Sequence, residues 1–352
     1  MIRIQRALVD GVRNARQASD LHDYLQQAIK LEHATIPPYL TAMLSLTPGV
    51  NDRIGRLIRS IVVEEMLHMS IAANILIAIE GHPAINVPGF VPTYPGPLPM
   101  SIGGAGFEVG IAPFSIELVR KIFMTIEEPE HPIPVKDRTT LALPAYATIG
   151  EFYAAVKDKL HELGDGIFKV GPDKQMLSWF PPAELFPIVD VRSACAGIDI
   201  IVDQGEGTST DPFQSPGDPA HYYKFGEIAA GRELIQTPNG YAYGGKAVPF
   251  DPAGVHPIKS NCKIADFPAD SLAGERIREF ALSYSNLLNA LHETFNGRPE
   301  TINDVMGLMY ELKVTAPRLM TTPIPGLGGA TVGPSFEYIT ASGPERPPRT
   351  GV

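Results

Sequence analysis

The chain is poor in cysteine and tryptophan, with two Cys and one Trp in 352 residues. Cys195 and Cys262 are too few for a disulfide framework, and they are not spaced as a zinc-binding motif. A disulfide-stapled secreted domain is therefore excluded, and a reducing cytoplasm is the expected location. The sequence also shows no long apolar run at its N-terminus and no segment that suggests a membrane span, so no membrane function is expected.

Positive charge is scarce as well. The 29 Lys and Arg residues face 39 Asp and Glu, the net charge is −10, and there is no basic cluster. Nucleic acid and anionic membranes are therefore poor partners for this chain. By contrast, 33 Gly and 34 Pro predict long ordered loops between the regular elements.

The most informative stretch is Glu65-Met66-Leu67-His68. Steps of three and four residues through it trace one face of a long helix, which is apolar except at its centre: Ile54, Ile58, Ile61, Glu65, His68, Ala72, Ile75 and Ile79. A buried carboxylate is costly unless it is paired, hydrogen-bonded or bound to metal. Glu-x-x-His facing the interior of a helical bundle is how carboxylate-bridged dinuclear sites are built.

A second long helix is expected over about 18–46, where Glu32 is the one acid on a mainly apolar face. The Pro-Gly turn within 47–51 is short, so the two helices must be antiparallel neighbours. Glu32 and Glu65 lie at nearly equal sequence distances from Gly49, and at about 1.5 Å per residue they reach nearly the same height.

The same reasoning pairs Glu206, at the end of a helix over about 190–204, with a helix that opens at Asp218-Pro219-Ala220-His221. Glu206 and Asp218 are equally distant from Pro212. Asp218 stays open between two roles, because an acid before a proline is also an ideal helix N-cap. The set of predicted metal ligands is then Glu32, Glu65, His68, Glu206, Asp218 and His221.

Three neighbouring residues are assigned to the surroundings of the site. Glu64 is a candidate partner for a histidine, Tyr222 a candidate pocket wall, and His33 a neighbour of the ligands or a surface residue. Four other residues are reserve ligands that we expect to be solvated or capping: Glu127, Glu151, His292 and Glu311. Two iron ions are the expected cofactor for dioxygen chemistry, and manganese or zinc remain alternatives.

The predicted fold is mainly α, a ferritin-like four-helix bundle with extra helices and long Pro/Gly-rich loops. Further helices are expected over about 115–128, 148–163, 272–295 and 302–320, and a short hairpin around 241–248. We expect one bundle domain over 1–323, with an inserted connection at about 82–187 and added C-terminal helices at about 272–320. Residues 324–352 should form an extended tail.

With these residues laid out, the sequence resembles the ferritin-like domain of iminophenyl-pyruvate dimer synthases, which occur in violacein- and rebeccamycin-type pathways. The resemblance lies in LEHATIPPYL (31–40), EEMLH (64–68), QGEGT (204–208), AHYYKF (220–225) and GPSFEY (333–338). It implies a ferritin-like fold, a diiron site, and oxidative coupling of imines derived from aromatic amino acids. The family usually has Glu where this chain has Asp218, and its pathway enzymes carry a further large region.

Three functional hypotheses follow. The first is a non-haem diiron oxidoreductase that acts on a small, amino-acid-derived substrate with dioxygen or peroxide. The second is a metal-binding or iron-handling protein without turnover, and a helical scaffold with a dead site is a third reading. A homo-oligomer is compatible with each of them.

Overall fold

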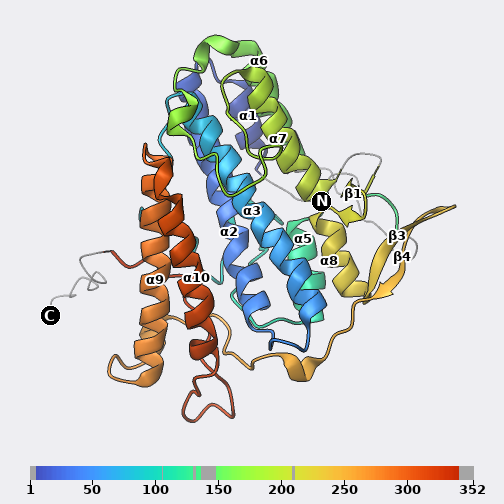
Figure 1. The fold of residues 1–352 in the computed structure, drawn as a ribbon, viewed down its shortest axis with the longest axis vertical. Helices are drawn as coiled ribbons and strands as arrows, with labels where there is room; N and C mark the ends of the chain where they lie inside the picture. Colours follow the sequence, from blue (N-terminus) through green and yellow to red (C-terminus); the bar gives the residue numbers. More distant parts are fainter. Residues whose placement is uncertain (1–4, 105, 130–131, 136–147, 208–210, 341–352) are drawn as a thin grey trace.

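Two long antiparallel helices form the centre of the molecule (Figure 1). The structure, a computed structural model, describes residues 5–104, 106–129, 132–135, 148–207 and 211–340, without the side chain of Glu206. Helix α2 (His22–Leu44) follows a 3-10 turn at Ala18–Leu21 and continues through two internal prolines. Helix α3 (Asp52–Ala78) returns beside it. The predicted antiparallel pair is confirmed.

Helix α3 is the one described helix that is long and apolar enough to cross a membrane by length and composition. The expectation that no segment approaches such a span was therefore wrong by this criterion. However, 83% of its apolar window is buried inside the molecule. A helix that other helices surround on most sides is apolar nearly all round. The apolar surface of α3 therefore belongs to the core of the bundle.

The rest of the bundle comes from shorter helices that pack on α3 or on one another. One nearly continuous helix consists of α4 (Ile116–Leu118), a π-helical turn η3 (Val119–Phe123) and α5 (Met124–Ile126). Helices α6 (Ile149–Leu163) and α7 (Val191–Glu206) pack together, and α7 and α8 (His221–Ala230) contact α3. The side chains of Ser115, Thr148 and Asp190 cap α4, α6 and α7, which fixes where these helices begin.

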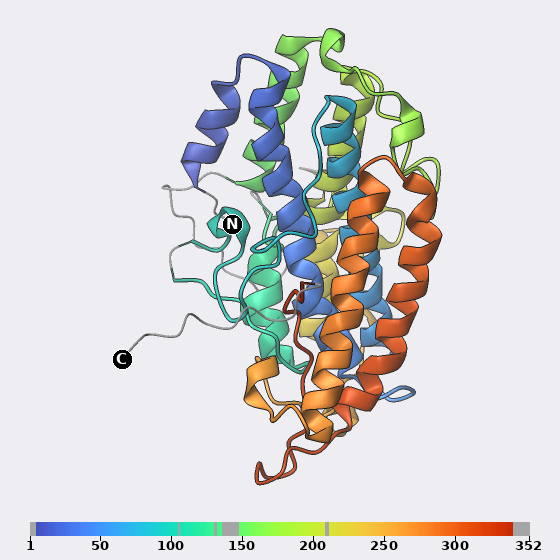
Figure 2. The same cartoon turned by 90° about the vertical axis from the view of Figure 1, so that its left-hand side faces the viewer.

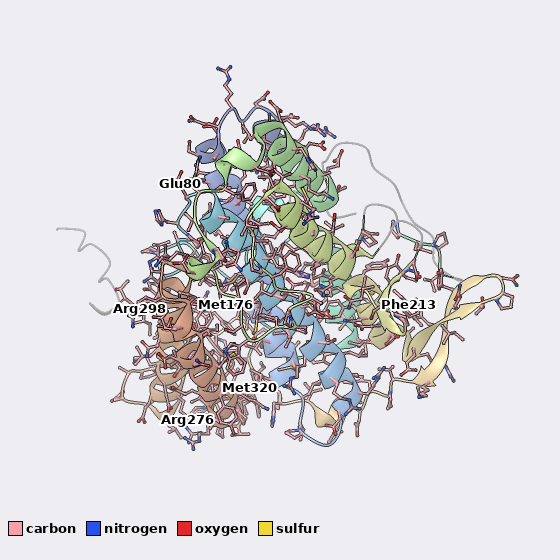
Figure 3. All side chains as sticks on the ribbon, turned by 45° about the horizontal axis from the view of Figure 1, so that its top comes forward. Glu80, Met176, Phe213, Arg276, Arg298 and Met320 are labelled. Atoms are coloured by element: carbon pink, nitrogen blue, oxygen red, sulfur yellow. The ribbon has the colours of Figure 1, made fainter. Side chains whose placement is uncertain are left out.

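Helices α9 (Leu272–Phe295) and α10 (Ile302–Met320) form a second antiparallel pair on the side of α2 and α3 away from α8 (Figure 1). Both match the predicted ranges. Arg276 near the start of α9 and Met320 at the end of α10 lie at one end of this hairpin, and Arg298 lies at the other (Figure 3). Helix α1 (Arg6–Arg13), which packs on α6, was not anticipated.

The described strands form two small sheets beside α8. Strand β1 (Phe213–Ser215) pairs with β2 (Asp218–Pro219), and β3 (Arg232–Thr237) pairs with β4 (Gly240–Ala247), both antiparallel. A hairpin was predicted around 241–248, but this range covers only β4, the second strand of the observed hairpin. Pro238 and Asn239 form the turn that joins β3 to β4, and Gly240 follows them as the first residue of β4. Proline, asparagine and glycine in succession are a turn signal that places the first strand before them.

Loops with short 3-10 turns complete the chain: Pro99–Ser101, Asp165–Ile167, Pro172–Lys174, Pro252–Gly254, Ile264–Asp266 and Pro299–Thr301. Residues 324–340 of the predicted tail follow α10 and turn back beside α9 (Figure 2). Thr331 forms an isolated parallel bridge with Ile258. Residues 341–352 of that prediction lie outside the described residues. The architecture is mainly α, as predicted.

Candidate metal centre

Glu32, Glu65 and His68 meet in the interior between α2 and α3. Each is at most 6% exposed. Their candidate ligand atoms all lie within 4.8 Å of one another, and Nδ1 of His68 is 3.6 Å from Oε2 of Glu32. The equal heights deduced from the turn at Gly49 explain this meeting, because the two carboxylates face each other across an antiparallel pair.

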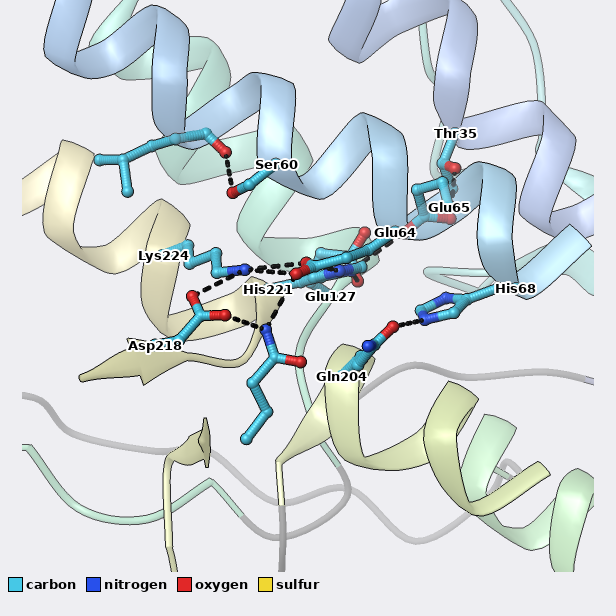
Figure 4. A network of polar contacts seen from close by, with 12 residues as sticks. Thr35, Ser60, Glu64, Glu65, His68, Glu127, Gln204, Asp218, His221 and Lys224 are labelled. Carbon is cyan, nitrogen blue, oxygen red and sulfur yellow. Dashed lines mark hydrogen bonds and ion pairs between the residues drawn. The ribbon is translucent and has the colours of Figure 1, made fainter. Parts of the chain in front are cut away.

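A second group consists of Glu65, Glu127 and His221, so Glu65 belongs to both groups. Nδ1 of His221 lies 3.0 Å from Oε1 of Glu65 and 3.5 Å from Oε2 of Glu127. The rings of His68 and His221 are stacked with their centroids 5.4 Å apart. The two groups therefore form one continuous polar cluster. Figure 4 shows its members Glu65, His68, Glu127 and His221 together with the polar side chains around them.

The outer nitrogens of both imidazoles fix which nitrogen faces the cluster. Nε2 of His221 is 2.9 Å from a Glu64 carboxylate oxygen, and Nε2 of His68 is 2.9 Å from Oε1 of Gln204. Both partners are acceptors, so each Nε2 carries the proton and donates it. In the neutral tautomer, each Nδ1 then presents its lone pair to the carboxylates.

This arrangement fits a bound cation. Nδ1 of His221 is buried and has no hydrogen-bond partner among the described atoms. A lone pair that faces carboxylate oxygens is repelled by them unless a cation lies between. Imidazole nitrogens and carboxylate oxygens together suit divalent transition metals, and the shared Glu65 suits a bridge between two of them. The buried Glu and His groups could therefore hold metal ions.

In the metal-free site, the pKa values of Glu65, His68 and His221 are all raised, so protonation of these residues is favoured. Burial, reinforced by Glu127, raises the pKa of Glu65 to about 7. Burial opposes protonation of His221, yet the neighbouring carboxylates of Glu127, Glu64 and Glu65 raise its pKa well above the usual value. Burial also opposes protonation of His68, but the carboxylate of Glu32 more than offsets this effect. The pKa of His68 is therefore raised as well. Protons take the place that a cation would occupy.

Hydroxyl groups hold the carboxylates in place. Tyr153 donates to Glu32 at 2.6 Å, Tyr39 donates to Glu127 at 2.6 Å, and Thr35 donates to Glu65 at 2.8 Å. Such outer contacts set the orientation of metal-binding carboxylates and are part of the site.

Glu64 and Lys224 form an ion pair behind His221. Nζ of Lys224 lies 2.8 Å from Oε2 of Glu64, and the Lys224 side chain is only 1% exposed. Burial would raise the pKa of Glu64, but His221 and Lys224 together lower it to about 2. Glu64 therefore stays ionised and accepts the His221 proton, in the histidine-partner position proposed from the sequence.

Asp218 lies outside both groups. Its side chain is 47% exposed, is 3.1 Å from Nζ of Lys224 and accepts from Gln214 at 2.9 Å. The expected helical start at Asp218 was wrong: Asp218 and Pro219 belong to β2, and α8 begins at His221 with Ala220 as its N-cap residue. Asp218 is therefore neither one turn before His221 nor a helix cap. Glu206 is the last residue of α7, and its side chain lies outside the described part of the chain.

Glu127 is the residue that sequence reasoning undervalued. Expected to be a solvated or capping residue, it is 6% exposed and belongs to the second group. The π-helical turn just before it alters the helical phase, and π turns are frequent at functional sites. A signal was present, because Val119, Phe123 and Glu127 form an i, i+4 stripe in which the acid is the one polar member. Glu151, by contrast, caps α6 as expected.

His33 and Tyr222 are both buried, but neither belongs to the two groups. Nε2 of His33 is 2.7 Å from the Tyr284 hydroxyl, its ring packs on Phe90, and burial lowers its pKa to about 3. Tyr222 follows His221 on α8 and contacts the ring of Tyr223.

A cavity of about 40 Å³ lies at the cluster, with Glu32, Glu65, His68 and Glu127 among its lining residues. Apolar side chains such as Leu31, Ile102 and Ile149 complete its walls. It has room for an ion and one or two water-sized molecules.

Asp218→Asn should leave metal content unchanged, since Asp218 contacts Lys224 and Gln214 rather than the cluster. We expect metal analysis after reconstitution to give the same number of ions per chain as the unmodified protein. A lower metal content in Asp218→Asn would show that Asp218 is a ligand.

The comparisons with known proteins concern the family and the fold. A family model described as Ferritin-like matches residues 25–230, a segment that contains every member of the two groups. A ferritin-like protein from Caulobacter vibrioides, solved as a crystal structure, is similar with a TM-score of 0.56 and 25% sequence identity, over 90% of this chain and 97% of that chain. No curated protein matches the chain. Because the family match covers more than half of the sequence, this chain belongs to the ferritin-like family.

Proposed function

We propose that the protein is a non-haem diiron oxidoreductase that uses dioxygen or peroxide. The observation that supports this most directly is the pair of buried carboxylate–imidazole groups that share Glu65, with both Nδ1 atoms turned inward. Glu32, Glu65 and His68 would hold one ion, and Glu65, Glu127 and His221 the other. Two iron ions so placed would supply the one-electron steps that dioxygen or peroxide chemistry requires.

The residues of the chain would bind the ions, orient them and exclude water. Three carboxylates offset most of the charge of two divalent ions, and Glu64 and Gln204 keep the two imidazoles in the tautomer that ligation needs. The apolar walls of the cavity limit access of bulk water. Tyr39 and Tyr153 can hold a proton at the outer oxygens of Glu127 and Glu32.

We propose a small, amino-acid-derived substrate, and oxidative coupling of imines is the reaction that the sequence resemblance suggests. The cavity of about 40 Å³ has room for dioxygen or peroxide but not for an organic molecule, so the organic substrate would have to bind outside it. A cytoplasmic location accords with the two cysteines, both of which are free and buried.

The decisive experiment separates turnover from storage. The protein is loaded anaerobically with ferrous iron, its iron content is measured, and oxygen uptake is followed after mixing with air-saturated buffer. We expect about two iron ions per chain and oxygen uptake that stops at a fixed ratio to this iron unless a reductant is supplied. Continued mineral loading together with cage assembly on gel filtration would favour the iron-handling alternative. Iron binding without oxygen uptake would overturn the oxidoreductase proposal.

A further inference from the structure

A second cavity, of about 510 Å³, lies away from the metal centre, and we call it the tail pocket. Its walls come from four parts of the chain: residues 88–94, Ile111, residues 261–263 and residues 334–340. It shares no lining residue with the metal cavity. Tyr94, in its wall, donates to the backbone oxygen of Ala34, which lies about 200° around α2 from Glu32. The tail pocket is large enough for a drug-sized organic molecule.

Specific contacts hold the walls of the tail pocket together. Asn261 adopts a left-handed backbone conformation with φ of 55°, which lets its side chain accept from the backbone of Ile111 at 2.7 Å. The backbone N–H of Gly333 donates to the Cys262 thiol at 3.3 Å, and a Cβ at Gly333 would lie 2.5 Å from the Lys259 carbonyl. These contacts join the tail to residues 259–262 and make the pocket a preformed feature.

The lining of the pocket indicates the chemistry of its ligand. Tyr94, Phe336 and Tyr338 supply aromatic rings, and several prolines add rigid apolar surface. Lys263 is the one cation in the wall, and no described carboxylate oxygen lies within 4.0 Å of its amine. Glu337, the one acid in the wall, already accepts from the Ile264 backbone at 2.7 Å and from Ser335 at 2.6 Å. An anionic group is therefore favoured at Lys263 and disfavoured at the Glu337 end.

We propose that the tail pocket binds a small aromatic carboxylate, with its carboxylate at Lys263 and its ring against the aromatic and proline side chains. Flat rings gain contact area against such walls at little cost in conformational entropy. Lys263 is partly buried, and its ammonium group can form charge-assisted hydrogen bonds with a carboxylate. The proposal requires no metal, and it stands or falls separately from the proposed oxidoreductase.

Two fluorescent probes of the same shape test it: 2-naphthoate, which carries the charge, and 2-naphthamide, which is neutral. Titration of the full chain should show saturable binding of 2-naphthoate, about tenfold tighter than 2-naphthamide. Lys263→Met should remove this preference and leave 2-naphthamide binding unchanged. Tyr338→Ala should weaken both probes by about threefold, because it removes ring contact without touching the charge.

The controls locate the binding. Lys313→Met removes an exposed cation from α10 and should change neither affinity. Glu65→Ala, which we expect to lack metal, should bind both probes as the unmodified chain does. Absence of saturable naphthoate binding, or an equal preference in Lys263→Met and the unmodified chain, would overturn the proposal. A loss of naphthoate binding in Glu65→Ala alone would place the probe at the metal centre and overturn it as well.

Discussion

Glu65→Ala is expected to lose most of the bound metal from both positions. Glu65 is the one residue common to the two described groups, and its two oxygens face different neighbours: Oε1 lies 3.0 Å from Nδ1 of His221, and Oε2 accepts from Thr35. A bridging carboxylate also keeps two cations close together by screening their repulsion. We therefore expect metal analysis after reconstitution to fall from about two ions per chain to well below one.

Glu117→Ala is the matched control for this loss. It removes a carboxylate from α4, where the side chain is 73% exposed and pairs only with Lys121 among the described residues, and it should keep the full metal content. Far-ultraviolet circular dichroism should show native helix content in both variants. Full metal retention in a folded Glu65→Ala protein would remove the basis for the metal centre.

Periodicity alone was sufficient for the first half of the cluster. Glu32, Glu65 and His68 lie on regular helices joined by a short turn, so side-chain direction and height follow directly from residue spacing. The ends of α9 and α10 were equally predictable, because both helices are amphipathic along their whole length.

The second half could not be predicted in the same way, because its backbone departs from regular helix. A π-helical turn interrupts the helix that ends at Glu127. A short strand pair precedes α8, which begins only at His221, and Asp218 lies beside Lys224. The role of Gln204 depends on a contact with a residue 136 positions away along the chain, which local patterns do not encode. Glu64 was a predicted histidine partner, but only the folded chain identifies His221 as that histidine. The tail pocket is likewise made of irregular loops whose register only the folded chain defines.

The stability of the metal-free protein should fall as pH rises from about 6.5 to 8.5. The pKa of Glu65 is about 7 in the folded protein against an ordinary 4.5, so the folded state holds a proton that the unfolded state has already released. Its stabilising contribution is full below pH 4.5 and is lost as pH rises through about 7. The pKa values of His68 and His221 are also raised, so their contributions are lost in the same direction above about 6.5.

Glu64 and His33 also have shifted pKa values, but their contributions to stability do not change between pH 6.5 and 8.5. The folded pKa of Glu64 is lowered to about 2, so its contribution changes only below its ordinary value of 4.5. The pKa of His33 is lowered to about 3, and its contribution changes only below about 6.5. Between pH 6.5 and 8.5 the raised pKa values of the cluster should dominate, with an expected loss of about 1–2 kcal/mol in the free energy of unfolding.

Metal should reverse this dependence, because the ions replace the same protons. Thermal unfolding of chelator-treated and iron-loaded protein at pH 6.5, 7.5 and 8.5 would measure both trends, with the stabilisation by metal growing toward high pH. Glu65→Gln supplies the matched variant, since its amide keeps the shape but does not titrate. Its metal-free form should lose less stability with rising pH and exceed the unmodified metal-free protein at pH 8.5. Equal pH dependence in the two metal-free proteins would show that Glu65 does not hold the extra proton of the folded state. Metal binding would then displace no proton from Glu65.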